Sequence, residues 1–433
     1  MEKTQQYLYS KPQKRFTTLV VSLTIVSVVV LSVGGVLLWN FIVSRGAFTF
    51  KGWQYGKLQV AFVDVGQGDC IIIRFPDGRS MIIDGGERGR GGGFRGAYSS
   101  VVSRFARGMG IERFDYMMLT HPSSDHHGGL IQVMRDFEVG TFIVPNVPNE
   151  QPFYGPSVSY ADFLLYMQKQ IDTGGARKYY SVRGLHISSA EVYALDSVGA
   201  LSERAYERAS AEVMGGALTH LSTCNLVQKD KQRENFYFTV LSPLYITDYA
   251  RVRTNARITY GEISLNDSSA VAVLQFLDRR FLFTGDLEMR GEYALIEHSA
   301  GYNFVGGGFR RPYRSLFNNI DVLKLAHQGS FTSTHDVFLE VVAPRNRAMF
   351  AVAQAGIDNQ FGHPHQVVFD RLARHGVSHT DIFRTDLDGS VVFTVYCTGN
   401  TYTGAMRVET ENQRRGDFTV VQFRFYYVGR KLS

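Results

Sequence analysis

The chain has 433 residues, of which 44% are hydrophobic and 20% charged, a composition typical of a globular protein with a large core. Its formal net charge of +6 and its pI near 9.0 favour anionic partners. The three cysteines are odd in number and form no Cys-x-x-Cys pair (Cys70, Cys224 and Cys397). Composition therefore excludes a disulfide framework and a thiolate zinc site.

The first 57 residues predict a membrane anchor. Residues 1–15 are polar and basic, residues 16–43 contain no charged side chain, and residues 44–57 read as a linker. The apolar segment is long enough to cross a hydrocarbon layer of roughly 30 Å. It exceeds the apolar region of about 7–15 residues in a cleaved signal peptide. Basic residues are denser before this segment than after it, which predicts a cytoplasmic N-terminus and an extracytoplasmic domain at an inner or plasma membrane.

From residue 58 onward, short apolar runs alternate with helical patterns. Strands are expected at 58–64, 70–75, 81–83, 114–119, 141–144, 236–241, 270–276, 281–283, 321–325, 348–352 and 390–396. Helices are expected at 99–109, 160–171, 288–298, 334–342 and 366–374. Residues 195–233 read as an insertion, and the tail beyond 398 shows strand-like alternation at 418–427. Two runs of strands with interposed helices predict two sheets packed face to face, with helices outside.

One loop carries the strongest chemical signal. Thr120-His121-Pro122-Ser123-Ser124-Asp125-His126-His127-Gly128-Gly129 lies between an expected strand and an amphipathic pattern that starts at Leu130. Such a loop directs imidazole and carboxylate groups at one point, and these are ligands of divalent metals. The alternative is a solvated, histidine-rich turn.

Other polar residues follow apolar strands. Asp286 comes after a buried strand, where its charge needs a cation such as a metal, although it could equally cap the next helix. His327 ends another strand and is either a ligand or a core residue. Asp64 and Asp84 also end strands, and Asp84 is placed to orient a ligand histidine. His363, before a helix, offers a phosphate contact or a proton, or belongs to a plain turn.

Arginines cluster in two stretches of the sequence, which include Arg88, Arg90, Arg95, Arg104, Arg107 and Arg113, and then Arg310, Arg311 and Arg314. A solvated basic face and a nucleic-acid track explain them equally well. No helix-turn-helix or zinc-finger pattern accompanies them.

The motifs resemble those of the metallo-β-lactamase superfamily, and more narrowly the soluble domain of ComEC-type DNA-uptake proteins. In order they are Val63-Asp64-Val65-Gly66-Gln67-Gly68-Asp69, Ile83-Asp84-Gly85-Gly86, the 120–129 loop, Phe283-Thr284-Gly285-Asp286, His327 with Gly329-Ser330, and Gly362-His363-Pro364. The resemblance covers residues 58–396 and leaves 397–433 as a β extension. It implies an α+β fold, a four-layer αββα sandwich, behind a single transmembrane helix. The multi-span channel of ComEC is absent, so a role in DNA uptake does not carry over.

The resemblance also implies a metal site for one or two divalent ions. One ion would be held by Asp125, His126, His327 and a bridging Asp286; the other would keep His121 and Asp286, helped by Asn266 or Asp267. Ser123 stands where the superfamily has its second histidine. An oxygen-rich, partly filled site adds Mn²⁺ and Mg²⁺ to Zn²⁺ as expected metals.

The function expected from these residues is metal-dependent hydrolysis. Asp125 or Asp286 would orient the attacking hydroxide, and His363 or Lys324 would offset charge on the leaving group, with Ser330 also at the substrate. DNA or another anionic phosphodiester is the first expected substrate. The alternatives are a small ester, lactam or thioester, or a non-catalytic scaffold with a degraded site.

Overall fold

The computed structural model describes residues 50, 52–87, 98–145, 158–175, 178–186, 189–194, 236–241, 264–300, 314–344, 347–397 and 404–412, with five residues between 24 and 34. The chain divides into two units, 1–48 and 49–433, and the second is the subject below. Most of the predicted anchor at 16–43 lies outside the described residues, as do the 195–233 insertion, the 418–427 strand and five of the clustered arginines. Among described residues, no helix combines the length and apolarity needed to span a bilayer.

The first sheet has nine strands in the order β15-β14-β1-β2-β3-β4-β5-β6-β7. Its strands are β1 (Leu58–Phe62), β2 (Ile71–Arg74), β3 (Ser80–Ile83), β4 (Phe114–Met118), β5 (Val139–Pro145), β6 (Lys178–His186), β7 (Ser189–Ala194), β14 (Val391–Cys397) and β15 (Gly404–Thr410). Strands β3 to β6 run parallel, whereas β15, β14, β1, β2 and β3 pair antiparallel in that order.

The second sheet has six strands in the order β13-β12-β11-β10-β9-β8. They are β8 (Phe236–Val240), β9 (Ala272–Phe276), β10 (Arg279–Phe283), β11 (Val322–Lys324), β12 (Phe350–Ala353) and β13 (Ile382–Arg384). From β10 to β13 every pairing is parallel.

The two sheets pack through an aromatic core. Phe62 of β1 lies with its ring centroid 6.3 Å from that of Phe283 of β10 and 5.9 Å from that of Phe393 of β14. Phe75, after β2, stacks on Phe236 of β8 at 4.7 Å. These rings are fully buried, and each such side chain contributes roughly 1.5–3 kcal/mol through burial of its apolar surface. The apolar side chains that alternate along the strands therefore pack at the contact between the two sheets.

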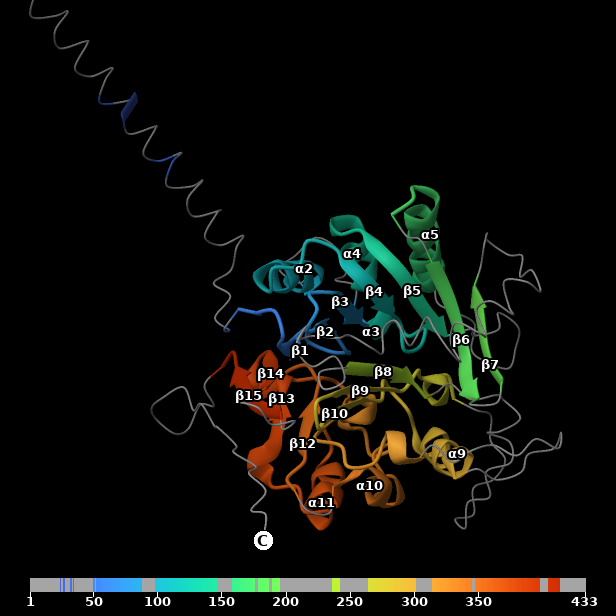
Figure 1. Ribbon diagram of the computed structural model, residues 1–433. Coiled ribbons are helices and arrows are strands. Elements are labelled where there is room, and N and C mark those ends of the chain that lie inside the picture. Colours follow the sequence, from blue (N-terminus) through green and yellow to red (C-terminus); the bar gives the residue numbers. More distant parts are fainter. Residues whose placement is uncertain are drawn as a thin grey trace, which may run out of the picture. The chain divides into compact units, whose positions relative to one another are not determined.

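Helices cover the outer faces (Figure 1). On the first sheet lie α2 (Tyr98–Gly108), α4 (Leu130–Asp136) and α5 (Val158–Asp172), which contact one another in turn. On the second lie α9 (Met289–Ser299), α10 (Asp336–Val342) and α11 (Gln366–Arg374), whose apolar faces share a buried cluster with β9 to β12. The order of layers is helix, sheet, sheet, helix, which confirms the predicted sandwich.

Four strands are absent from the sequence prediction: β6, β7, β13 and β15. All lie at or next to an end of a sheet. An edge strand is less enclosed than a central one, so its sequence mixes charged and apolar residues and its pattern is weak. Because β15 pairs with β14, this part of the predicted β extension belongs to the first sheet.

The carboxyl ends of the parallel strands in both sheets lie close together. Asp84 follows β3, His121 follows β4, Asp286 follows β10 and His327 follows β11. Side chains after neighbouring parallel strands meet at the same sheet edge. The fold therefore brings together residues that are separated by more than 200 positions.

Candidate metal centre

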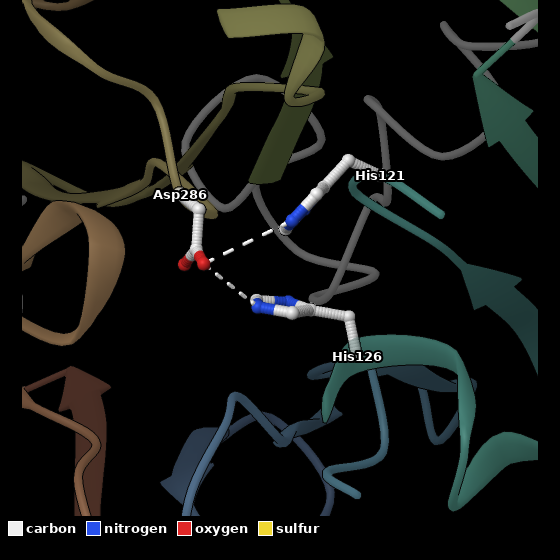
Figure 2. Close-up of side chains that lie close together, drawn as sticks. All are labelled: His121, His126 and Asp286. Atoms are coloured by element: carbon white, nitrogen blue, oxygen red, sulfur yellow. Dashed lines mark ion pairs between the residues drawn. The ribbon is translucent and has the colours of Figure 1, made fainter. Parts of the chain in front are cut away.

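A single carboxylate oxygen lies at the middle of the site. Oδ2 of Asp286 is 3.1 Å from Nε2 of His126, 3.8 Å from Nε2 of His121 and 3.9 Å from Nε2 of His327. Figure 2 shows how the imidazoles of His121 and His126 point at this carboxylate from the 120–129 loop. The histidines and Asp286, which the sequence predicts as metal ligands, thus converge in the fold.

Each histidine has a polar partner at its other ring nitrogen. Nδ1 of His126 lies 2.8 Å from Oδ2 of Asp84, and Nδ1 of His327 lies 3.2 Å from Oε1 of Glu288. Nδ1 of His121 lies 3.1 Å from Oγ1 of Thr120, whose hydroxyl donates to Asp84 at 2.6 Å. Such partners fix the tautomer and the ring orientation of metal-ligating histidines. The position of Asp84 matches its predicted role beside a ligand histidine.

This network leaves one lone pair unused. The hydroxyl proton of Thr120 goes to Asp84, so its oxygen accepts the Nδ1–H of His121. Nε2 of His121 then carries a lone pair, and this fully buried atom has no hydrogen-bond partner among the described residues. Burying an unpaired polar atom costs about 1–3 kcal/mol. A divalent ion between His121, His126 and Asp286 would satisfy it, so the donor set fits a metal.

Electrostatics also suit a cation. Burial opposes ionisation of Asp286, but His126, His121 and His327 overcome that effect and hold its pKa well below its usual range. Burial likewise works against protonation of His126, yet Asp286, Asp125 and Asp84 raise its pKa well above the usual value. Burial and the neighbouring His126 lower the pKa of His121, which stays neutral. Asp286 and His126 thus each favour the charged form of the other.

Asp125 stands at the more open side of the centre. Its Oδ2 is 3.8 Å from Nε2 of His126, and its side chain is 26% exposed, against 4% for Asp286. Burial raises its pKa, although His126 acts against this. A carboxylate here can contact a solvent molecule that enters the site, which suits the predicted role of orienting water.

Glycines bring the loop backbones into contact. A Cβ on Gly129 would lie 1.9 Å from the carbonyl oxygen of Gly85, and one on Gly68 would lie 1.9 Å from that of Asp125. Any side chain at either position would push the 120–129 loop away. Ser123, at the position of the missing histidine, precedes the one-turn helix α3 (Ser124–His127), which carries Asp125 and His126.

Lys324 is buried rather than open to substrate. Its Nζ pairs with Oδ2 of Asp69 and donates to the carbonyl oxygen of Gly285 at 2.9 Å, and its side chain has no exposed surface. Burial raises the pKa of Asp69 to about 7 despite this pairing. The structure therefore favours a supporting position for Lys324, because it holds the Gly285 turn that presents Asp286, over the predicted contact with substrate.

The other predicted substrate residues lie beyond His327. Ser330 is buried and its hydroxyl is 3.0 Å from that of Thr332. The ring of His363 lies 5.3 Å from that of His327 and is mostly buried. Burial, with the charges of His327 and His365, lowers the pKa of His363 to about 4. His363 is therefore a neutral imidazole beside the metal centre at neutral pH.

Asn266 and Asp267 bond to Glu288 and to the start of α9, respectively. The amide of Asn266 donates to Oε1 of Glu288 at 3.4 Å. Oδ1 of Asp267 accepts the backbone N–H of Gly291 at 2.8 Å, at the start of α9. The described contacts tie Asn266 to a carboxylate that supports His327 and give Asp267 a helix-capping position.

Asp64 lies apart from the metal cluster. Its backbone N–H donates to Oγ of Ser390 at 3.1 Å, and its Oδ1 accepts the N–H of Gly66 at 3.0 Å. Burial, and to a lesser degree the charges of Glu411 and Asp386, raises its pKa to about 6. None of the described contacts joins it to the histidines. Its carboxylate is an electrostatic cost at neutral pH.

Replacing Asp64 with asparagine should therefore stabilise the protein at alkaline pH. A carboxyl with a folded pKa of about 6 and an unfolded pKa of 3.8 favours folding while it is protonated, and that contribution is lost as pH rises from about 4 to about 6. Asparagine keeps the bond to Gly66, so we expect a gain of about 2–3 kcal/mol at pH 8 that shrinks toward zero near pH 4. Urea unfolding across this range measures it, and a gain independent of pH would contradict it.

Several residues of the site were not predicted from the sequence. They are Asp69, Thr120, Ser269, Glu288 and Gln328. Asp69 stands within one of the quoted motifs and Glu288 begins an expected helix, but neither has an expected contact with the ligand residues. Thr120, Glu288 and Gln328 lie within two residues of His121, Asp286 and His327 in the sequence, which was the one signal available for them. Only the fold shows that they contact the ligand residues.

The geometry agrees with comparisons to known proteins. Residues 63–187 match the model of the metallo-β-lactamase superfamily. Over 355 residues the chain is 25% identical to ComE operon protein 3 of Bacillus subtilis (strain 168), an alignment that covers 77% of this chain and 33% of that protein. It is 33% identical over 132 residues to Competence protein ComA of Neisseria gonorrhoeae, covering 30% of this chain and 16% of that protein.

The chain carries a metallo-β-lactamase-superfamily domain and is similar to ComEC-type proteins. It spans about a third of the length of ComE operon protein 3 and less of ComA, so it aligns with one part of each relative.

Solved structures show a looser likeness. The diiron β-hydroxylase CmlA from Streptomyces venezuelae has a TM-score of 0.35 at 14% identity, covering 77% of this chain and 53% of CmlA. A diphosphatase of the PhnP family has a TM-score of 0.34 at 10% identity, covering 79% of this chain and 100% of the diphosphatase. At these scores the likeness says nothing about chemistry.

Proposed function

We propose that this metallo-β-lactamase-type hydrolase cleaves phosphodiester bonds of nucleic acid at the outer face of a membrane. The observation that carries the proposal is the convergence of three imidazole Nε2 atoms on Oδ2 of Asp286, each ring held by a polar partner at Nδ1. A divalent ion bound there would supply Lewis acidity toward a phosphoryl oxygen and a lower pKa for water. The chain would hold that ion with His121, His126, His327 and Asp286.

The protein's own groups complete the chemistry. Asp125, at the more open side, accepts a hydrogen bond from the attacking water and so orients it toward the phosphorus. His363 lies against His327 as a neutral imidazole, and its Nδ1 has no partner among the described atoms. This places a hydrogen-bonding group next to the reacting centre.

Two observations support nucleic acid as the substrate. The chain has a net charge of +6, which attracts a polyanion. Exposed aromatic rings also flank the site: Phe361 is 53% exposed and stacks on His363 at 5.6 Å, and Phe331 is 56% exposed with its ring 5.2 Å from that of His365. Nucleobases stack on such rings, at about 1–3 kcal/mol per base. A lactam or thioester would gain less from these rings.

The uncharged segment at 16–43 is proposed as the anchor, with residues 1–15 in the cytoplasm. Retention of the full chain in membranes washed with alkaline carbonate, and its release by detergent, would support this arrangement. Release by carbonate alone would argue against it.

The activity is tested on the detergent-purified full chain loaded with Mn²⁺ or Zn²⁺. Labelled single- and double-stranded DNA should be cleaved, and binding should weaken steeply as salt rises. A His126→Ala preparation, purified identically, should be inactive and exposes any contaminating nuclease. If the protein hydrolyses a thioester or a β-lactam and does not cleave DNA, its substrate belongs to one of those classes and not to nucleic acids. Absence of bound metal in the wild type would favour a non-catalytic module.

A further inference from the structure

Gln328 lies inside the metal centre and has no assigned role. It follows His327 in the short helical turn η4 (Ala326–Gly329) and is 1% exposed. Both residues have left-handed backbone angles, with φ of 50° at His327 and 51° at Gln328. Two successive non-glycine residues in this region cost of order 1–3 kcal/mol each, a strain that occurs at ligand-binding sites.

The side-chain amide sits among the ligand atoms. Nε2 of Gln328 is 2.8 Å from Oδ1 and 3.0 Å from Oδ2 of Asp286, and 3.3 Å from Nε2 of His126. Oε1 of Gln328 accepts a hydrogen bond from Nε2 of Gln67 at 3.3 Å. The partial positive charge of the amide hydrogens therefore touches the atoms that a cation would contact.

The amide occupies the space that a cation would need. An ion held by His126 and Asp286 would meet the N–H₂ of Gln328, whose hydrogens it repels. Turning the amide by half a rotation sets its oxygen against the Asp286 carboxylate, and this contact becomes favourable once a cation attracts both oxygens.

We propose that Gln328 is a further ligand of the metal, which turns its amide when the ion binds. Without the ion, the N–H₂ face neutralises Asp286; with the ion, Oε1 faces it. The heavy atoms of an amide exchange places with little movement, so the turn fits a closely packed site. Gln67 can turn with it, offering its oxygen to the N–H₂ of Gln328 in place of the N–H of Gly356 that it now accepts at 3.3 Å.

Substitution distinguishes a ligand from a group that merely fills the site. If Gln328 only competes with the ion, Gln328→Ala should bind metal more tightly. If it is a ligand, Gln328→Ala should weaken binding by about tenfold or more, and Gln328→Glu should tighten it because it retains an oxygen and adds charge. Metal affinity is measured on the full chain by competition between the protein and a chromophoric chelator for Zn²⁺ or Mn²⁺.

Controls separate local effects from general instability. Gln354→Ala removes another fully buried amide, which donates to the carbonyl oxygens of Val63 and Cys70, and should leave metal affinity unchanged. Should Gln328→Ala fail to fold, Gln67→Ala gives the same direction of change with a smaller effect. Unaltered or tighter metal binding in Gln328→Ala, or in Gln67→Ala where that variant replaces it, would overturn the inference. It rests on the metal site of the proposed function, and wild-type protein that binds no metal would refute that function instead.

Discussion

Replacing Asp286 with alanine should lower hydrolysis by about a thousandfold or more, since losing about 4 kcal/mol of metal-borne stabilisation corresponds to that factor. Asp286 is the residue whose Oδ2 all three histidines approach, so no other described group can take its place. Metal content should fall together with activity. Elemental analysis of the purified protein and a DNA-cleavage time course measure the two quantities.

The control for this variant is Asp388→Ala. Asp388 is equally buried, but its carboxylate accepts the backbone N–H of Arg384, and no described contact joins it to the histidines. It should lose stability and keep its metal. If Asp286→Ala retains full metal and full rate, the centre described above is not the catalytic site.

At alkaline pH, where Asp69 with its pKa of about 7 is ionised, replacing Lys324 with methionine should destabilise the protein by about 3–5 kcal/mol, the cost of leaving a buried charge without its partner. The lysine is fully buried, pairs with Asp69 and holds the carbonyl oxygen of Gly285. Methionine has similar length and fills the same space, so the decrease in the free energy of unfolding measures the loss of the charge and not a loss of packing. Equilibrium unfolding in urea gives the free energy.

The double variant Asp69→Asn/Lys324→Met removes both charges. It should recover most of the loss, because replacing a whole buried ion pair is far less costly than breaking it. A single Lys324→Met variant as stable as the wild type would show that Asp69 is neutral in the folded protein.

Much of the fold was predictable because its central strands are strongly apolar. β1 and β12 present only apolar side chains to the sheet interface, and β10 adds Phe281 and Phe283; the predicted strands there are confirmed within a few residues. The strands at or next to a sheet edge, β6, β7, β13 and β15, were not predicted, since pairing with neighbouring strands sets their register. Pairing with a neighbouring strand, more than local pattern, defines such strands.

The candidate site, like the fold, was predicted from the sequence in part. His121, His126 and Asp286 each follow an apolar strand, which predicted their convergence, and Asp84 was placed beside a histidine by the same reasoning. Gln328 was missed because an amide carries no charge to mark it. Lys324 was expected to offset charge on the leaving group, but it is the last residue of β11 and its side chain is fully buried.

The spread of the ligands along the chain has a consequence for biosynthesis. The imidazoles of His121 and His126 leave the ribosome long before Asp286 and His327, and a domain of this kind folds as a unit. A nascent chain that ends before residue 286 offers two histidines without the carboxylate on which they converge, so the group formed by His121, His126 and Asp286 is incomplete. Metal capture is thereby confined to the finished domain, and truncated translation products would carry none of its hydrolytic capacity.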